Sequence, residues 1–421
     1  MEEFQKVLER ELKTVPRRFL ERRLSERLLE AGIRASDADL TRASEHLLSG
    51  NTETFYFGDI DDHATIEITE DDLEYVVAKS EEFYKEKLVD MLHDVGGQTA
   101  ELFYQVLKKR WAAEFVAQQE EMVAFKERLE MRWGMALGKL RMLLTIVMEW
   151  AQGAFERKQR NPGRKLPHLD DVLLRLHVRA CQVTHEIIVL LENGYADGAM
   201  ARWRTLHEIA ITAAVIAKFG DEIAERYVHY QIVESHKAAI AYEQNHQALG
   251  FKPISKRQSE RIRRDLKKTI ERFGAEFGNE YGWAAHRVGG GKKKRITFAD
   301  LEAEAGDAMM RSPYKMASYN VHASPKGVYF KMGTLDGSPA LLAGASNAGL
   351  ADPGQHTAVS LMEITLLLID DSSNFDDIVA AKLVARLGVD IPKEFGRASR
   401  RLRRDDRRNR QSSSSIVGSN S

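Results

Sequence analysis

The stretch LDDVLLRLHVRACQVTHEIIVL, residues 169–190, decides the fold class of this chain of 421 residues. Its apolar residues recur every three or four positions, at Leu169, Val172, Leu173, Leu176, Ala180, Val183, Ile187 and Leu190. This is the period of one face of an α-helix. Asn193-Gly194 then predicts a tight stop, and a second helix is expected from about Ala196 to Phe219. Because so short a connection makes two helices antiparallel neighbours, the sequence predicts a helical bundle.

The rest of the second half extends this bundle. Helical patterns cover about residues 221–249 and 255–277, and a short helix restarts near Thr297. The segment from Ala358 to Ile369 is apolar almost all round, which predicts a central helix. We expect the bundle domain to span residues 165–390.

The first half is also expected to be helical, with one exception. Residues 1–70 read as short amphipathic helices plus a β-hairpin, because residues 54–57 and 64–69 alternate apolar and polar side chains around an Asp-rich turn. Residues 71–160 form a nearly continuous helical pattern, the predicted long helical arm, with an interruption expected at Gly96-Gly97 and a possible second one at Gly134. Long uncapped helices are typical of coiled pairs, so we expect a homodimer through residues 71–158.

The C-terminal residues 391–421 are predicted to be a disordered, basic, Ser-rich tail. Residues 397–410 hold eight arginines against Asp405 and Asp406, and four serines follow. The fold class is therefore mainly α, with a helical bundle, a helical arm, one small hairpin and this tail.

Composition excludes several classes of protein. The chain has 62 Lys+Arg against 63 Asp+Glu, so no overall charge favours nucleic acid or membrane. The single cysteine, Cys181, cannot form an internal disulfide and suits a reducing compartment. No run approaches the ~18 apolar residues of a membrane span, and the start has no apolar signal region. We therefore expect a cytoplasmic protein without a membrane partner.

Motifs for cofactors and metals are absent as well. The triphosphate-binding loop, the His-Glu-x-x-His zinc helix, paired metal-binding cysteines and the repeated Glu-x-x-His of di-iron bundles all fail to match. The sequence thus predicts no cofactor and no metal.

Polar residues gather instead in two places. In residues 311–327, Tyr314, Ser318 and His322 follow one another at intervals of four, which stacks them on one face of a helix. Earlier, Arg204 and Glu208 lie one helical turn apart. The site hypothesis requires the patches around 204–208 and 314–324 to meet inside the bundle.

Each polar residue also has a plainer interpretation. Arg204 and Glu208 can form a surface ion pair or a structural brace, and His322 can be a structural histidine. Glu363, a lone carboxylate in an apolar helix, can lie at the helix edge. Alternatively, Glu363 or Glu208 holds Arg204 or orients His322, since a buried carboxylate needs a partner.

The two patches carry a family resemblance. The segment LENGYADGAMARWRTLHE, residues 191–208, followed by Tyr-x-x-x-Ser-x-x-x-His-Ala-Ser-Pro-Lys-Gly over residues 314–327, resembles an uncharacterised bacterial helical domain family of unknown function. The likeness covers roughly residues 165–375. It implies no established reaction. The recurrent polar positions that it implies are Arg204, Glu208, Tyr314, Ser318, His322 and Ser324.

A second resemblance is to the HEPN ribonucleases of bacterial toxin and phage-defence systems, which are small helical bundles. Their signature, Arg followed four to six residues later by His, is met by Arg202 and His207. Residues five apart on a helix point about 140° away from each other, so His322 with Arg204 is the better pair.

The HEPN resemblance implies a metal-independent mechanism. His322 would take the proton of a ribose 2′-hydroxyl, and Arg204 would stabilise the charge that develops on phosphorus. The RNA backbone would be held by the basic tail and by a set of basic and polar residues, namely Lys292, Lys293, Lys294, Arg295, Ser324 and Lys326.

Two functions therefore remain open. The first is a non-catalytic binding or sensing module, in which the polar residues form a structural network. The second is an endoribonuclease of the HEPN kind. We prefer the first because the chain holds no complete catalytic signature.

Overall fold

The computed structural model describes residues 2–49, 54–56, 66–159, 168–291, 293, 295–335, 341–369 and 375–418. It divides into two units, residues 1–118 and residues 119–421. Most of the described residues are helical, as the sequence predicts. None of the described helices is long and apolar enough to cross a membrane.

The N-terminal unit consists of short helices around a small core. Its elements are α1 (Glu2–Leu12), α2 (Val15–Glu30), α3 (Asp37–Leu48), α4 (Glu70–Glu82), the π-helical turn η1 (Phe83–Lys87) and the first part of α5 (Leu88–Gln159). The core joins Leu20 and Leu24 of α2 to Ala43 of α3 and Val76 of α4. Residues 71–159 of the predicted arm are helical, and the predicted interruption at Gly96-Gly97 is therefore wrong.

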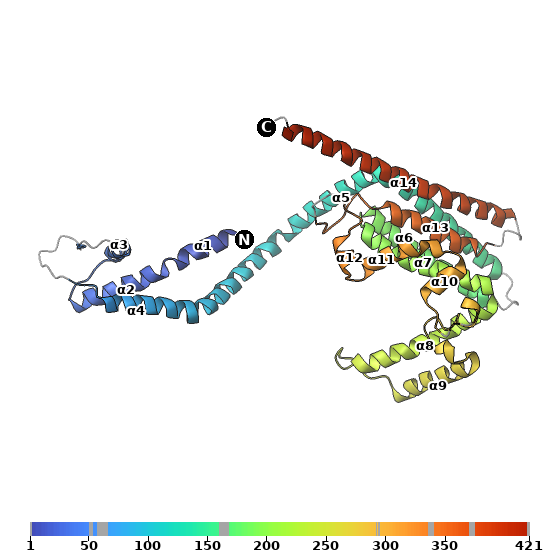
Figure 1. The fold of residues 1–421 in the computed structure, drawn as a ribbon, viewed down its shortest axis with the longest axis horizontal. Coiled ribbons are helices and arrows are strands. Elements are labelled where there is room, and N and C mark those ends of the chain that lie inside the picture. The colour runs from blue at the N-terminus through green and yellow to red at the C-terminus, as the bar shows by residue number, and fades with distance from the viewer. Residues whose placement is uncertain are drawn as a thin grey trace. The chain divides into compact units, whose positions relative to one another are not determined.

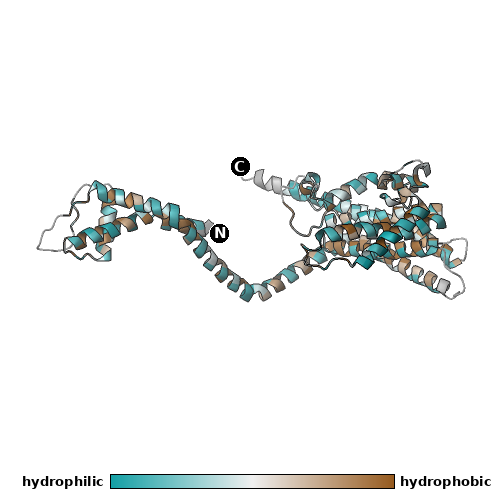
Figure 2. Cartoon of the chain, turned by 90° about the horizontal axis from the view of Figure 1, so that it is seen from below, coloured by the Kyte–Doolittle hydropathy of each residue, from teal (hydrophilic) through white to brown (hydrophobic). Residues whose placement is uncertain are grey.

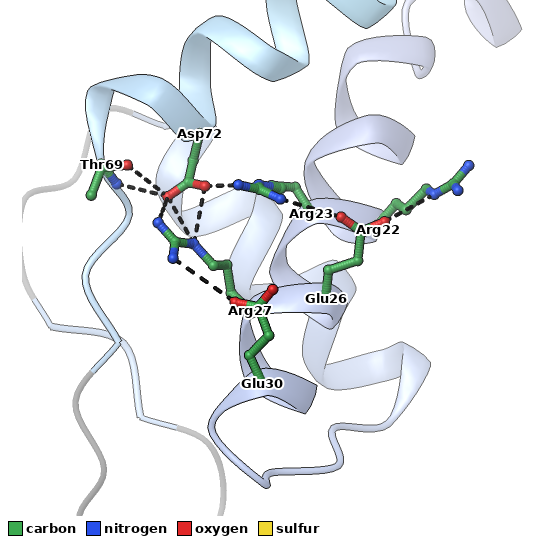
Figure 3. Close-up of polar contacts among 7 residues, drawn as sticks. All are labelled: Arg22, Arg23, Glu26, Arg27, Glu30, Thr69 and Asp72. Atoms are coloured by element: carbon green, nitrogen blue, oxygen red, sulfur yellow. Dashed lines mark hydrogen bonds and ion pairs between the residues drawn. The ribbon is translucent and has the colours of Figure 1, made fainter.

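A buried carboxylate fastens α4 to α2 (Figure 3). Asp72 is fully buried and accepts hydrogen bonds from Arg23 (2.8 Å) and from Arg27 (2.9 Å). It also accepts from the backbone N–H of Thr69 (3.0 Å), which completes a capping box at the start of α4. The hydrogen bond from Arg27 is the largest cause that holds the pKa of Asp72 well below its usual range.

The predicted β-hairpin is wrong for the residues that can be described. Residues 54–56 and 66–69 form no strand, and the intervening residues 57–65 lie outside the described part of the chain. Phe55 and Ile68 pack against the small helical core instead. These apolar side chains of the alternating pattern are therefore buried by packing on helices, and not by the pairing of strands.

The second unit is the bundle (Figure 1). Its α-helices after α5 are α6 (His168–Glu192), α7 (Ala196–Phe219), α8 (Asp221–Asn245), α9 (Lys256–Phe273), α10 (Phe298–Ala305), α11 (Arg311–Val321), α12 (Pro325–Tyr329), α13 (Ala351–Leu366) and α14 (Phe375–Gly418). The short 3₁₀ turns are η2 (Ala275–Gly278), η3 (Val288–Gly291) and η4 (Ala308–Met310). Residues 161–167 (NPGRKLP), whose prolines and glycine predict a linker, lie outside the described residues.

Helix α7 lies at the centre of this unit and packs against α6, α10, α11 and α13. Its Trp203, Leu206 and Ala213 are fully buried. The turn between α6 and α7 forms where Asn193-Gly194 predicts it, and Gly194 has φ +76°. A Cβ there would also lie 2.8 Å from the Ser346 carbonyl oxygen, so glycine is required for both conformation and space.

The prediction of a disordered tail is wrong over most of its length. Helix α14 runs through the predicted tail to Gly418, and its Ile391, Phe395 and Ala398 are buried at intervals of three or four residues. This apolar stripe packs one side of an otherwise arginine-rich helix into the bundle. The residues beyond 418 lie outside the described part of the chain.

Helix α14 runs antiparallel to the second half of α5. Three polar contacts join the two helices in reversed order: Trp150 to Asp377 (2.7 Å), Lys139 to Glu394 (2.8 Å) and Arg132 to Asp405 (2.9 Å). In Figure 2, hydrophobic residues concentrate where the bundle helices pack and are scattered along α5. The bundle core therefore includes apolar residues between positions 129 and 147 of α5 and between positions 384 and 398 of α14.

Candidate functional site

Tyr314 of the second polar patch meets Arg204 and Glu208 of the first at the contact between α7 and α11. The Tyr314 hydroxyl donates to Glu208 Oε1 (2.7 Å), and Arg204 Nε donates to the same oxygen (3.0 Å). The Arg204 guanidinium lies 5.0 Å from the centre of the Tyr314 ring, a cation–π contact. We call these three residues the α7–α11 cluster.

Local helix geometry explains the α7–α11 cluster. Arg204 and Glu208 are one turn apart on α7, so their side chains meet. Tyr314 lies with Ala317 on the buried side of α11 and is 7 % exposed. Burial raises the pKa of Tyr314, and the hydrogen bond to Glu208 raises it further. The phenol therefore stays protonated and remains the donor.

A second group of polar contacts, largely buried, lies next to the α7–α11 cluster. His207 Nε2 is 3.1 Å from Glu302 Oε1, and Arg311 donates to the other oxygen of Glu302 (2.8 Å). His207 and Glu302 are at most 1 % exposed. Asp307 lies 3.7 Å from His207 Nδ1, and burial is the main cause that raises its pKa. This group ties α7 to α10 and α11.

Sequence reasoning missed the role of this second group. Glu302 is separated from His207 by 95 positions along the chain. The helix near Thr297 was predicted, and its capping box with Asp300 is present. Nothing in the spacing indicates which face of that short helix meets α7. The only signal in the sequence was that His207 and Glu302 each lie on a helix with an apolar face, where a buried polar side chain needs a partner.

Aromatic rings continue from these contacts into the bundle. Trp203 lies between His207 (ring centroids 5.2 Å apart) and His356 (4.7 Å). The indole N–H of Trp203 donates to Ser360 Oγ of α13 (3.2 Å). On the other side, the rings of Phe298 and Tyr314 are 4.7 Å apart.

Other residues predicted for the site lie outside these contacts. Ser318 donates to the backbone carbonyl of Tyr314 (2.9 Å), one turn back on its own helix. His322 ends α11 and is exposed, and its side chain makes no hydrogen bond or ion pair with any described residue. Ser324 caps α12 by accepting from the backbone N–H of Gly327 (3.2 Å).

The predicted basic loop is only partly described. Lys293 pairs with Asp300 (2.5 Å), and Arg295 is exposed. Lys292 and Lys294 lie outside the described residues.

Arg202 and His207, which match the Arg–His spacing of the HEPN signature, do not contact each other. Arg202 pairs with Glu186 of α6, whereas His207 contacts Glu302 of α10. The two side chains therefore point to different neighbours, as expected for residues five apart on a helix.

Glu363 is half-buried on α13, and burial, followed by repulsion from Asp307, raises its pKa to about 7.

A cleft of about 760 Å³ lies on the other side of α11. Residues of α11, α12, α13 and α14 line it, together with residues 330–332, 334 and 335. Met200 and His356 are among the lining residues that come from the central helices. Of the individually named site residues, only Lys326 lines this cleft, and the α7–α11 cluster does not. Arg403, Arg407 and Arg410 of the predicted basic tail also line it.

The walls of the cleft are held by specific backbone contacts. A Cβ on Gly327 would lie 2.0 Å from the Tyr319 carbonyl oxygen, so only glycine lets α12 fold this closely onto α11. The backbone N–H of Met332 donates to Asp197 at the start of α7 (3.1 Å). These contacts fix Lys326, Tyr329 and Lys331 along the cleft.

Basic residues dominate the charged groups of the cleft. Lys326, Lys331, Arg403, Arg407 and Arg410 line it, against Asp352 and Asp406. Asp406 pairs with Arg410 (3.0 Å). Burial lowers the pKa of His356 and outweighs the opposing effect of Asp352. The imidazole is therefore uncharged near neutral pH and is available for hydrogen bonding.

Residues 170–339 match the model of a family of unknown function (DUF5677). The predicted resemblance to such a family is thereby confirmed, whereas no likeness to HEPN ribonucleases was found. The match includes the α7–α11 cluster but excludes α13 and α14. Searches of curated proteins and of solved structures found no match.

Within the described residues, no group of three or more His, Cys, Asp or Glu could hold a metal ion.

Proposed function

We propose that this chain is a non-catalytic binding or sensing module, in which the α7–α11 cluster braces the helix that forms one wall of the ligand cleft. The observation that supports this proposal is the mutual saturation of the cluster. One oxygen of Glu208 accepts from both Tyr314 and Arg204, and the same guanidinium covers the Tyr314 ring. Groups that satisfy one another in this way are typical of a structural network.

The two sides of α11 have different surroundings: one side packs in the core, and the other lines the cleft. Tyr314 and Ala317 face the core, while Ser312, Met316 and Tyr319, spaced by four and three residues, line the cleft. A hydrogen bond that fixes the inner side therefore also fixes the outer side. We infer that the cluster contributes to ligand binding indirectly, by holding this wall in place.

The alternative is a metal-independent endoribonuclease that uses His322 and Arg204. General-base catalysis needs the imidazole and the cation near a common phosphate. Arg204 is engaged by Glu208 and Tyr314, and His322 is exposed at the end of α11 without a polar partner among the described residues. Neither residue lines the cleft. No described contact favours this alternative.

An RNA-cleavage assay separates the two proposals. The full chain is incubated with single-stranded and duplex RNA, in parallel with His322→Ala and with His185→Ala, a control that removes another exposed histidine. We expect no cleavage above buffer for any of the three proteins. Cleavage by the parent that is lost in His322→Ala and kept in His185→Ala would refute the non-catalytic proposal.

We also propose that the chain forms a homodimer through the arm, residues 71–158. Val95, Leu102, Val106 and Val116 on α5 are 46–69 % exposed. Their spacings of seven, four and ten residues fit positions a and d of one heptad register, the seam of a coiled coil. An exposed apolar stripe of this kind is stabilised by a second copy of the same helix.

Light scattering at micromolar concentration tests the dimer. The parent should have twice the mass of the chain, and Leu102→Glu should shift it towards the monomer. A matched variant, Gln118→Glu, adds the same charge at an exposed polar position f of the same register, away from the seam, and should leave the dimer intact. A monomeric parent would exclude the proposal.

A further inference from the structure

We propose that the cleft between α11 and α14 binds a phosphorylated nucleoside, either a free nucleotide or a unit of a single-stranded nucleic acid. Lys331, Arg403 and Arg407 would hold the phosphate, and the base would stack on the aromatic side chains at the rim. This inference rests on the proposed binding function and names its ligand.

The first support is unbalanced charge. Of the five basic residues that line the cleft, Arg410 pairs with Asp406 (3.0 Å), and Lys326 lies over the Tyr319 ring (5.0 Å). Lys331, Arg403 and Arg407 form no ion pair with any described residue. A cleft lined by one sign of charge concentrates ligands of the opposite sign.

The second support is the spacing of two of these cations; the third, Lys331, is half-buried where it lines the cleft. Arg403 and Arg407 lie one turn apart on α14 and both face the cleft. Two neighbouring guanidinium groups match the oxygens of a phosphate through paired N–H donors.

The third support is aromatic surface beside these cations. Tyr329 is 90 % exposed and Phe330 is 49 % exposed, and both line the cleft. Exposed aromatic rings next to unneutralised arginines are the arrangement with which proteins bind nucleotide bases and their phosphates together. A purely inorganic anion would not use these rings.

The fourth support is the size and floor of the cleft. Its volume, about 760 Å³, falls in the range of small-molecule sites and accommodates a nucleotide. His356 lies among the lining residues, and its ring packs against that of Trp203 in a tilted contact, with ring centroids 4.7 Å apart. An uncharged, fixed imidazole can exchange a hydrogen bond with a base or a ribose hydroxyl.

Binding is measured with the full chain by fluorescence anisotropy of a labelled single-stranded RNA of about ten nucleotides. Competitors are AMP, ATP, inorganic triphosphate and adenosine. We expect AMP or ATP to displace the RNA and adenosine to fail, because the phosphate contributes the charge contacts. Displacement by nucleotides at micromolar concentration identifies a free nucleotide as the ligand, whereas displacement by unlabelled RNA alone identifies a single strand.

Paired variants locate the site. Arg403→Gln/Arg407→Gln removes two cations from the cleft, and Arg401→Gln/Arg404→Gln removes two exposed cations from the same helix but away from the cleft. The first variant should weaken binding about tenfold or more and make it less dependent on salt, as expected for two lost phosphate contacts. The second should stay within about twofold of the parent.

A third variant tests the stacking. Tyr329→Ala should weaken RNA or nucleotide binding about fivefold or more, while competition by inorganic triphosphate stays unchanged. Thermal unfolding of every variant checks that the bundle is intact. We expect an unchanged Tm, because all substituted side chains are exposed.

Equal losses in the two arginine variants would mean general electrostatic attraction and would overturn the cleft as the site. Absence of binding by both RNA and nucleotides at about 0.1 M salt would overturn the ligand. Neither result affects the non-catalytic proposal. Conversely, RNA cleavage that depends on His322 would end that proposal and leave the binding result to stand.

Discussion

Replacing Tyr314 by Phe is the sharpest test of the α7–α11 cluster, because it removes one hydroxyl and keeps the ring. The hydroxyl donates to Glu208 at 2.7 Å, while the ring contacts Phe298 and the Arg204 guanidinium. The apolar surface and the cation–π contact survive in Tyr314→Phe. The loss of free energy therefore reports the hydrogen bond alone.

Its magnitude follows from the surroundings of Glu208. A hydrogen bond to a charged group contributes about 1.5–3 kcal/mol. The side chain of Glu208 is 36 % exposed and keeps its bond to Arg204, so water replaces part of the lost interaction. We therefore expect the lower end, about 1.5 kcal/mol. In a bundle of this size this corresponds to a fall in Tm of about 3 °C.

Thermal and denaturant unfolding, followed by the fluorescence of the buried tryptophans, measure this effect. The control is Tyr329→Phe, whose hydroxyl is in solvent and whose removal should change stability by less than about 0.5 kcal/mol. A double-mutant cycle with Glu208→Gln should give a coupling energy near 1 kcal/mol. Zero coupling, or a Tyr314→Phe protein as stable as the parent, would show that the cluster is no brace.

Three further predictions concern the other buried carboxyl groups. Glu302→Gln should destabilise the bundle by about 2–4 kcal/mol in denaturant titrations, because it removes the charge that partners Arg311 and turns one of the two acceptor oxygens, which face Arg311 and His207, into an N–H donor; an unchanged midpoint would contradict the contact. Burial raises the pKa of Glu363 from 4.5 to about 7, so its neutral form is favoured in the folded state and stability should fall by up to about 3 kcal/mol as pH rises from about 4.5 to 7. Glu363→Gln should flatten that dependence in thermal scans, and a profile identical to the parent's would exclude the effect. The pKa of Asp72 is lowered in the fold, so its contribution is present above about pH 4 and is lost on acidification. Asp72→Asn should therefore increase hydrogen exchange in α2 and α4 at neutral pH, with α6 and α7 of the bundle as the internal reference.

The sequence alone determined the helical class and much of the bundle. The apolar period of residues 169–190 and the stop at Asn193-Gly194 predict α6, its turn and α7, because these features are local. The spacing of Arg204 and Glu208 likewise predicts their contact. Tyr314 was singled out by its spacing with Ser318 and His322, but of these three only Tyr314 contacts Glu208.

Tertiary packing decided the rest. The partners of His207 are Glu302 of α10 and Asp307, which directly precedes η4; both lie far along the chain, and no local pattern selects them. Phe55 and Ile68 alternate like strand residues yet pack on helices, and the arginine-rich end of α14 is ordered by a stripe that includes Phe395. The cleft exists only because α14 returns along α5 and brings its arginines opposite α11 and α12. Local spacing fixes which residues share a helix face, whereas the burial of those faces against one another determines what each side chain meets.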